Sequence, residues 1–92
     1  MTGDSYMVTP SAVALLRRPR VSDLTGKSRT KIYNDIAAGL FIRGVALGGG
    51  RVAWPLHEVE AINRARIAGA TDDDIRELVA QLHAARTGEG AI

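Results

Sequence analysis

One stretch of sequence decides the fold: Val21–Leu40, VSDLTGKSRTKIYNDIAAGL. Val21 and Leu24 are the apolar positions of a first short helix, and Gly26 permits the left-handed backbone of the turn that follows. Ser28 is a good N-cap for a second helix, because its hydroxyl can accept a hydrogen bond from a free amide one turn later. The apolar residues of the second helix recur at helical spacing: Ile32, Ile36 and Leu40. The stretch therefore predicts a helix-turn-helix.

The second helix, expected over residues 28 to 38, carries polar side chains away from its apolar stripe. In a helix-turn-helix this helix enters the DNA major groove, where arginine and lysine can bond guanine and asparagine can bond adenine. The predicted base contacts are Arg29, Thr30, Lys31 and Asn34. Asp35 is unfavourable beside phosphates, but its i, i+4 spacing from Lys31 predicts an ion pair with a structural role.

The charge of the 92-residue chain is unevenly distributed, although its net value is only +2. The segment from Arg17 to Arg51 holds eight basic and two acidic residues, a net +6, and the remainder carries −4. Such a distribution is typical of a basic face for a polyanion, or of a solvated surface with uneven charge. Because the basic segment coincides with the helix-turn-helix, we favour the polyanion. The expected phosphate contacts are Arg17, Arg18, Arg20, Lys27, Ser28 and Tyr33.

After the second helix the hydrophobic period changes. Residues 44–47 and 51–54 predict two short strands, with glycines 48–50 as a hairpin tip and Trp54 as its core anchor. Such a hairpin is a wing, and arginine from a wing can enter a narrow minor groove. The predicted wing contacts are Arg43, Gly49 and Arg51. Two alternatives stay open: the glycines form a flexible turn without contacts, or Arg51 merely packs over the hairpin or pairs with an acid such as Glu58.

The flanking segments complete the predicted domain organisation. Residues 1–11 are a polar arm, and residues 12–16 are an apolar piece that packs as a strand or a helical turn. Pro19 stands where the first helix begins. A third helix over residues 55–68 buries a stripe of apolar residues, Leu56, Val59 and Ile62, and completes a DNA-binding domain over residues 12–68.

A fourth helix is expected to reach residue 86, with a flexible tail over residues 87–92. Thr71 caps this helix, and the acids at 72–74 suit its dipole, although such a cluster could also suggest a cation site. Its apolar face follows the pattern i, i+3, i+4, i+7: Ile75, Leu78, Val79 and Leu82. The helix either covers the core or meets another chain, and we favour packing on the core.

Other chemistries lack support. The chain has no cysteine and only two histidines, so we expect no disulfide, no metal site and no cofactor. Residues 26–28, Gly-Lys-Ser, imitate a phosphate-binding loop, but Val21 stands where that motif needs glycine. Neither His57 nor His83 has a partner nucleophile, so we expect no enzyme and no small-molecule substrate. Without a membrane-spanning run or a signal peptide, the expected location is the cytoplasm.

The residues from Leu15 to about Ile67 resemble the AlpA family of phage-type regulators. The resemblance is carried by TG-x-SR-x-x-IY at residues 25–33, GRVAW at 50–54 and HEVEAI at 57–62. It implies a mainly α, MerR-like winged helix-turn-helix related to excisionases, here with an added C-terminal helix. Two departures affect base preference: Thr30-Lys31 stand where Ser-Thr is common, and Asn34 where arginine is common.

The resemblance implies a protein of a mobile element that acts on double-stranded DNA at the nucleoid. Two outputs are expected: regulation of transcription at a promoter, or recombination directionality, in which the protein bends attachment-site DNA so that an integrase excises the element. Integrase and further copies of the chain are the expected protein partners. The alternative function is a small interaction module that binds an integrase or self-associates through its fourth helix, without affinity for DNA.

Overall fold

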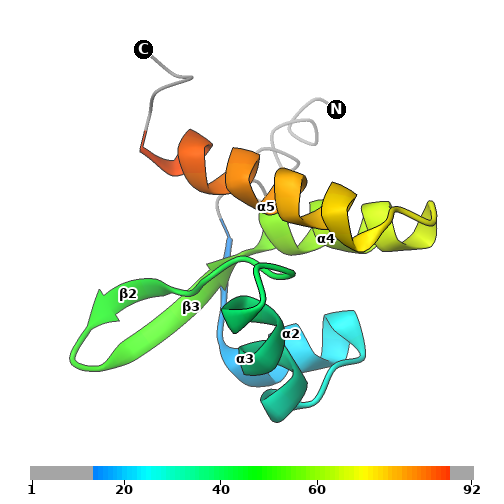
Figure 1. Cartoon of the computed structure of the whole chain (residues 1–92). Coiled ribbons are helices and arrows are strands. Elements are labelled where there is room, and N and C mark those ends of the chain that lie inside the picture. Colours follow the sequence, from blue (N-terminus) through cyan, green and yellow to red (C-terminus); the bar gives the residue numbers. More distant parts are fainter. Residues whose placement is uncertain (1–13, 88–92) are drawn as a thin grey trace, which may run out of the picture.

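The computed structural model of the protein describes residues 14–87, in which a short strand is followed by a pair of helices, a β-hairpin and a second pair of helices (Figure 1). The elements in order are β1 (Leu15–Leu16), α2 (Arg18–Thr25), α3 (Arg29–Ala37), β2 (Val45–Gly48), β3 (Arg51–Pro55), α4 (Leu56–Ile67) and α5 (Asp72–Arg86). This is a winged helix-turn-helix with an added C-terminal helix, as predicted. The expected arm at residues 1–11 and the tail beyond Thr87 lie outside the described residues.

The helix-turn-helix is built from local signals. Pro19 occupies the start of α2, where its missing N–H costs nothing, and Gly26 ends that helix with a φ of 74°. The Ser28 hydroxyl accepts a hydrogen bond from the Lys31 N–H at 3.1 Å, which confirms the predicted cap of α3. The helix stops at Ala37, one residue before the predicted end.

The strands form one antiparallel sheet in the order β1-β3-β2. Pairing of Leu16 with Trp54 shows that the apolar piece before α2 is a strand and not a helical turn. In the hairpin, Gly49 and Gly50 have φ values of 63° and 78°, the sign that a two-residue type I′ connection requires. The ladder contains an irregularity between Ala46 and Gly48. β2 begins and ends one residue later than predicted.

The core lies where α2, α3, α4, α5 and the base of the sheet meet. Its buried apolar residues are Val21, Ile32, Phe41, Ile42, Trp54, Val59, Ile62, Ile75 and Val79. Trp54 is fully buried and its indole N–H donates to the Ile42 carbonyl at 3.0 Å, so it anchors the hairpin as predicted. Figure 1 shows α5 lying across α4, and its residues Ile75 and Val79 enter this core. The prediction that the fourth helix packs on the core is confirmed.

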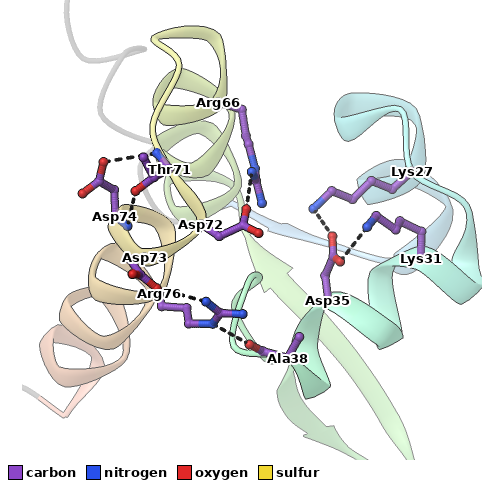
Figure 2. A network of polar contacts seen from close by, with 10 residues as sticks. All are labelled: Lys27, Lys31, Asp35, Ala38, Arg66, Thr71, Asp72, Asp73, Asp74 and Arg76. Atoms are coloured by element: carbon purple, nitrogen blue, oxygen red, sulfur yellow. Dashed lines mark hydrogen bonds and ion pairs between the residues drawn. The ribbon is translucent and has the colours of Figure 1, made fainter.

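The connection between α4 and α5 is short and capped. Gly69, with a φ of 86°, turns the chain after α4. Thr71 and Asp74 then form a reciprocal capping box: the Asp74 N–H donates to the Thr71 hydroxyl, and the Thr71 N–H donates to the Asp74 carboxylate, both at 3.1 Å (Figure 2). The acids at 72–74 are therefore used in the first turn of α5, as predicted.

Candidate nucleic-acid interface

The recognition helix α3 presents the predicted polar residues to solvent. Ile32 is fully buried and fixes the helix on the core, while Ile36 and Leu40 pack partly buried against it. The side chains exposed on the outer face are those of Arg29, Thr30, Lys31, Tyr33 and Asn34. The four predicted base contacts are thus all exposed on the same helix, two of them basic and two neutral polar, and Lys31 is also paired with Asp35.

Asp35 lies in α3 beside two lysines, on the buried side of the helix (Figure 2). Its carboxylate oxygens lie 2.8 Å from Lys27 Nζ and 3.0 Å from Lys31 Nζ. Burial raises the pKa of Asp35, but the hydrogen bonds and positive charges of Lys27 and Lys31 outweigh it, and the pKa lies below its ordinary value. The predicted pair with Lys31 is confirmed, and the carboxylate is buried with both of its oxygens paired.

Lys27 differs from its expected place as a phosphate contact. Its side chain is only 15 % exposed, and its ammonium lies 4.4 Å from the centre of the Phe41 ring as well as against Asp35. A cation held between a carboxylate and an aromatic ring has its charge already satisfied. The structure thus gives Lys27 a place within the helix-turn-helix, and we leave it out of the proposed DNA contacts.

Tyr33 joins the outer face of α3 to the core. Its ring packs edge-on against Trp54, with centroids 6.3 Å apart, and the residue remains 40 % exposed. The Arg29 guanidinium lies 5.9 Å from the Tyr33 ring on the outside. Tyr33 therefore has a fixed position and an exposed part, which agrees with the predicted phosphate contact.

The predicted phosphate contacts at the start of α2 are basic residues that precede α3 in the chain and are at least partly exposed to solvent. Arg17 and Arg20 are exposed, while Arg18 is partly buried and donates to the Ser22 hydroxyl at 2.9 Å. Asn63 of α4 donates to the Leu24 carbonyl at 2.9 Å, which ties the C-terminal end of α2 to the helical layer above it.

The hairpin β2–β3 extends away from the helices as a wing (Figure 1). Arg43, Gly49 and Arg51 are exposed, and an added Cβ at Gly49 would lie 3.9 Å from the Arg51 guanidinium. The alternative that Arg51 pairs with Glu58 is wrong, because Glu58 is buried and its carboxylate is bonded by Arg86.

Three side chains of α5 reach the end of α3 and the segment before the wing, and none was singled out by the sequence analysis as a contact of this kind. Arg76 donates to the Ala38 carbonyl at the C-terminal end of α3, at 3.0 Å, as Figure 2 shows. His83 and Arg86 bond the backbone of Arg43. These partners lie 38 to 43 residues apart in the chain, so no local pattern could have revealed them.

Other kinds of site find no support within residues 14–87. That part of the chain holds no group of histidine and acidic residues placed to bind a metal ion. His57 is exposed on α4, and the partly buried His83 accepts a backbone hydrogen bond. None of the described helices combines the length and the apolar character needed to cross a membrane.

Comparison with known proteins adds an independent line of evidence. The sequence model described as "Prophage CP4-57 regulatory protein (AlpA)" matches residues 14–66. The chain is also 50 % identical over 54 residues to the uncharacterized protein ORF88 of enterobacteria phage P4. That alignment covers 59 % of this chain and 61 % of the phage protein, so the chain spans somewhat less than two thirds of this relative. No solved structure matches the chain significantly.

Proposed function

Since the chain belongs to the AlpA family of prophage regulatory proteins, we propose that it binds double-stranded DNA with sequence specificity. One observation carries the proposal: Arg29, Thr30, Lys31 and Asn34 are all exposed on α3, a helix that is capped by Ser28 and packed on the core through buried Ile32. A capped helix with such side chains matches the requirements of major-groove recognition.

The proposed contacts divide by their role. Base edges would be read from α3 by Arg29, Thr30, Lys31 and Asn34. Phosphates would be bound by Arg17, Arg18, Arg20, Ser28 and Tyr33; the Ser28 oxygen accepts the cap bond, and its O–H can still donate. The wing would lie along an adjacent minor groove, with Arg43 and Arg51 as its cations and Gly49 allowing close approach.

For the biological output we propose regulation of a mobile element, through its promoter, its attachment site or both. The phage origin of the matched relative and the printed description of the family support this context. Recombination directionality would require an integrase as partner and several bound copies on the DNA. These partners, and action at the nucleoid in the cytoplasm, are parts of the proposal. The function needs no cofactor and no catalytic residue.

The alternative of a protein-interaction module acting through α5 has less support. Ile75 and Val79 of that helix are buried in the core of this chain, and Leu78 and Leu82 pack against the same core. The apolar face that a partner would use in this alternative is therefore occupied. An interaction module would also show no salt-dependent affinity for DNA, which makes the two functions separable by experiment.

The first test is the salt dependence of DNA binding. If five or six phosphates are neutralised, log K should fall with log salt at a slope of about −5. Footprinting on promoter and attachment-site DNA, with and without integrase, would then separate the outputs. Several closely spaced protected sites beside the recombination core would favour excision, and a single promoter site would favour transcriptional control. A binding constant insensitive to salt would overturn the proposal.

The second test concerns specificity. Replacing Arg29, Lys31 or Asn34 by alanine should lower discrimination between specific and random DNA by about 1–3 kcal/mol for each lost two-bond base contact. Arg64→Ala is a matched control, because Arg64 is 75 % exposed on α4 and pairs only loosely with Glu60 at 3.9 Å. If all three α3 variants fold and keep wild-type specificity, the recognition surface has been placed on the wrong helix.

A further inference from the structure

Arg43, the residue just before the wing, is held on both of its backbone polar groups by α5. Its N–H donates to His83 Nε2 at 3.1 Å. Its carbonyl accepts a hydrogen bond from Arg86 Nη2 at 2.8 Å. We call His83 and Arg86, with the backbone of Arg43 between them, the clasp. The Arg43 side chain takes no part in these two bonds and remains exposed.

Arg86 can act as a fixed support because it is itself held in place. Its Nε lies 2.9 Å and 3.1 Å from the two carboxylate oxygens of Glu58, and Nη2 also donates to Glu58. The Glu58 side chain is 2 % exposed and that of Arg86 is 17 % exposed. A paired guanidinium and carboxylate with little access to water have a well-defined geometry. The clasp thus ties the start of the wing to a rigid junction of α4 and α5.

On its β3 side the wing is anchored at its base, by buried Trp54, whose indole N–H donates to the Ile42 carbonyl, and by pairing with β1; the clasp holds the β2 side. β1 is only two residues long and pairs with the base of β3, at Trp54 and Pro55. Within the described residues, β2 pairs with β3 and has no strand on its other side. Figure 1 shows the hairpin leaving the helices near the C-terminal end of α5 and extending outward. A small rotation at Arg43 would therefore produce a larger displacement at the glycine tip.

We propose that His83 and Arg86 are positioning residues that set the angle of the wing against DNA. This role rests on the proposed DNA-binding function, but it does not require either side chain to touch DNA. Both residues lie in α5, beyond the segment 14–66 that matches the family. The clasp therefore makes the wing of this chain depend on a helix outside the matched segment.

The test is a pair of double-mutant cycles measured by fluorescence anisotropy on specific duplex DNA. His83→Leu removes the acceptor for the Arg43 N–H without leaving Glu58 unpaired, so that variant should fold. In the His83→Leu background, the loss of affinity caused by Arg51→Ala should shrink at least about twofold, because a displaced wing no longer delivers Arg51. The loss caused by Arg29→Ala should be the same in both backgrounds, since α3 is held separately.

Arg86→Lys is the second variant, because lysine keeps a charge for Glu58 but cannot donate to the carboxylate and the Arg43 carbonyl in the same fork. It should shrink the Arg51 effect in the same way. Arg66→Lys is its matched control: Arg66 bonds Asp72 at 3.3 Å across the α4–α5 turn and does not contact Arg43. If Arg51→Ala costs as much in both clasp variants as in the wild type, the positioning role is refuted.

Amide hydrogen exchange supplies a readout that does not use DNA. In His83→Leu, amides of β2 and β3 should exchange faster, while amides of α3 keep their wild-type protection. Faster exchange in the wing together with a wild type that does not bind DNA would mean that the clasp orders the wing but the proposed function is wrong. If His83→Leu changes amide exchange in the wing no more than it does in α3, the clasp is contradicted, whatever the result with DNA.

Discussion

Within residues 14–87 two carboxylates are buried, those of Asp35 and Glu58, and their charges are paired in different ways. Asp35 is 3 % exposed and pairs with lysines that precede it by eight and four residues in the chain. Glu58 is 1 % exposed and pairs with Arg86, 28 residues later, across two helices. The first pair closes within the helix-turn-helix. The second pair forms only when α5 has packed on α4.

This difference separates the two elements that we propose to contact DNA. Helix α3 has its cap, its turn and its buried charge cluster supplied by residues 26–35, and Arg76 of α5 adds one hydrogen bond to the Ala38 carbonyl at its end. The backbone of Arg43, two residues before the first strand of the wing, is bonded by Arg86 and His83, which belong to the last helix. We call Lys27, Lys31 and Asp35 the local cluster, and Glu58 with Arg86 the long-range cluster. The following variants test how differently the two clusters contribute to stability and to DNA binding.

Breaking the long-range cluster should have the largest effect. Arg86→Met leaves Glu58 buried without a partner and should lower the free energy of unfolding by about 3–5 kcal/mol, as measured by urea denaturation. That loss is a large share of the stability of a domain of this size. The double variant Glu58→Gln with Arg86→Met removes both charges and should recover more than half of the loss. Equal instability in single and double variants would show that packing, and not the unpaired charge, dominates.

Breaking the local cluster should cost less. Lys27→Met removes one of two cations from Asp35 and should lower the free energy of unfolding by about 1–3 kcal/mol, because Lys31 still pairs with the carboxylate. Lys31→Met is the matched comparison and should cost less still, since its side chain is 59 % exposed. A Lys31 variant less stable than the Lys27 variant would reverse our assignment of Lys27 as the structural cation.

Arg51→Ala should have a smaller effect, on DNA binding alone. It should weaken binding to specific DNA and to non-specific DNA by similar factors, about 1 kcal/mol in each case, because base pairs are poorly distinguished in the minor groove. Since Glu58 is paired with Arg86 and not with Arg51, removal of the Arg51 side chain should leave the melting temperature unchanged. A variant that binds DNA normally but melts several degrees lower would place Arg51 in the fold and not on DNA.

The smallest expected effect is on the pH dependence of stability. Burial, and then the charges of Arg43 and Arg86, lower the pKa of His83 below its ordinary 6.5, while the charge of Glu58 opposes this shift. Arg76 also faces His83, because both side chains line one pocket between α3 and α5. The unfolded chain therefore binds a proton first, and stability that is complete above pH 6.5 should decline as the pH falls toward the folded-state pKa. Urea midpoints at a series of pH values should show this decline in the wild type and not in His83→Leu. Asp35, whose pKa is also lowered, should add a separate loss only below its ordinary 3.8.

The sequence by itself determined the local architecture. Pro19, Gly26, Ser28 and Thr71 act within one turn of their own positions, so the helix ends could be predicted within one or two residues. The spacing of Asp35 and Lys31 predicted their ion pair, and the apolar periodicity predicted that α5 would cover the core. The proposed DNA contacts on α3 and the wing follow from the same local patterns and await the tests above.

Tertiary structure alone decided which charged side chains are buried and paired within the protein. In the sequence, Lys27 is one more cation of a basic segment, and Glu58 and Arg86 are ordinary residues of polar helix faces. In the folded chain the Lys27 side chain is largely buried beside Asp35, and Glu58 is buried in an ion pair with Arg86. The burial of these side chains depends on the packing of several elements and not on any one residue. The contacts of α5 with Ala38 and Arg43 likewise depend on packing between residues about 40 positions apart. Side-chain hydrogen bonds over such separations carry no periodic signal, because they depend on the angle at which two helices and a hairpin meet.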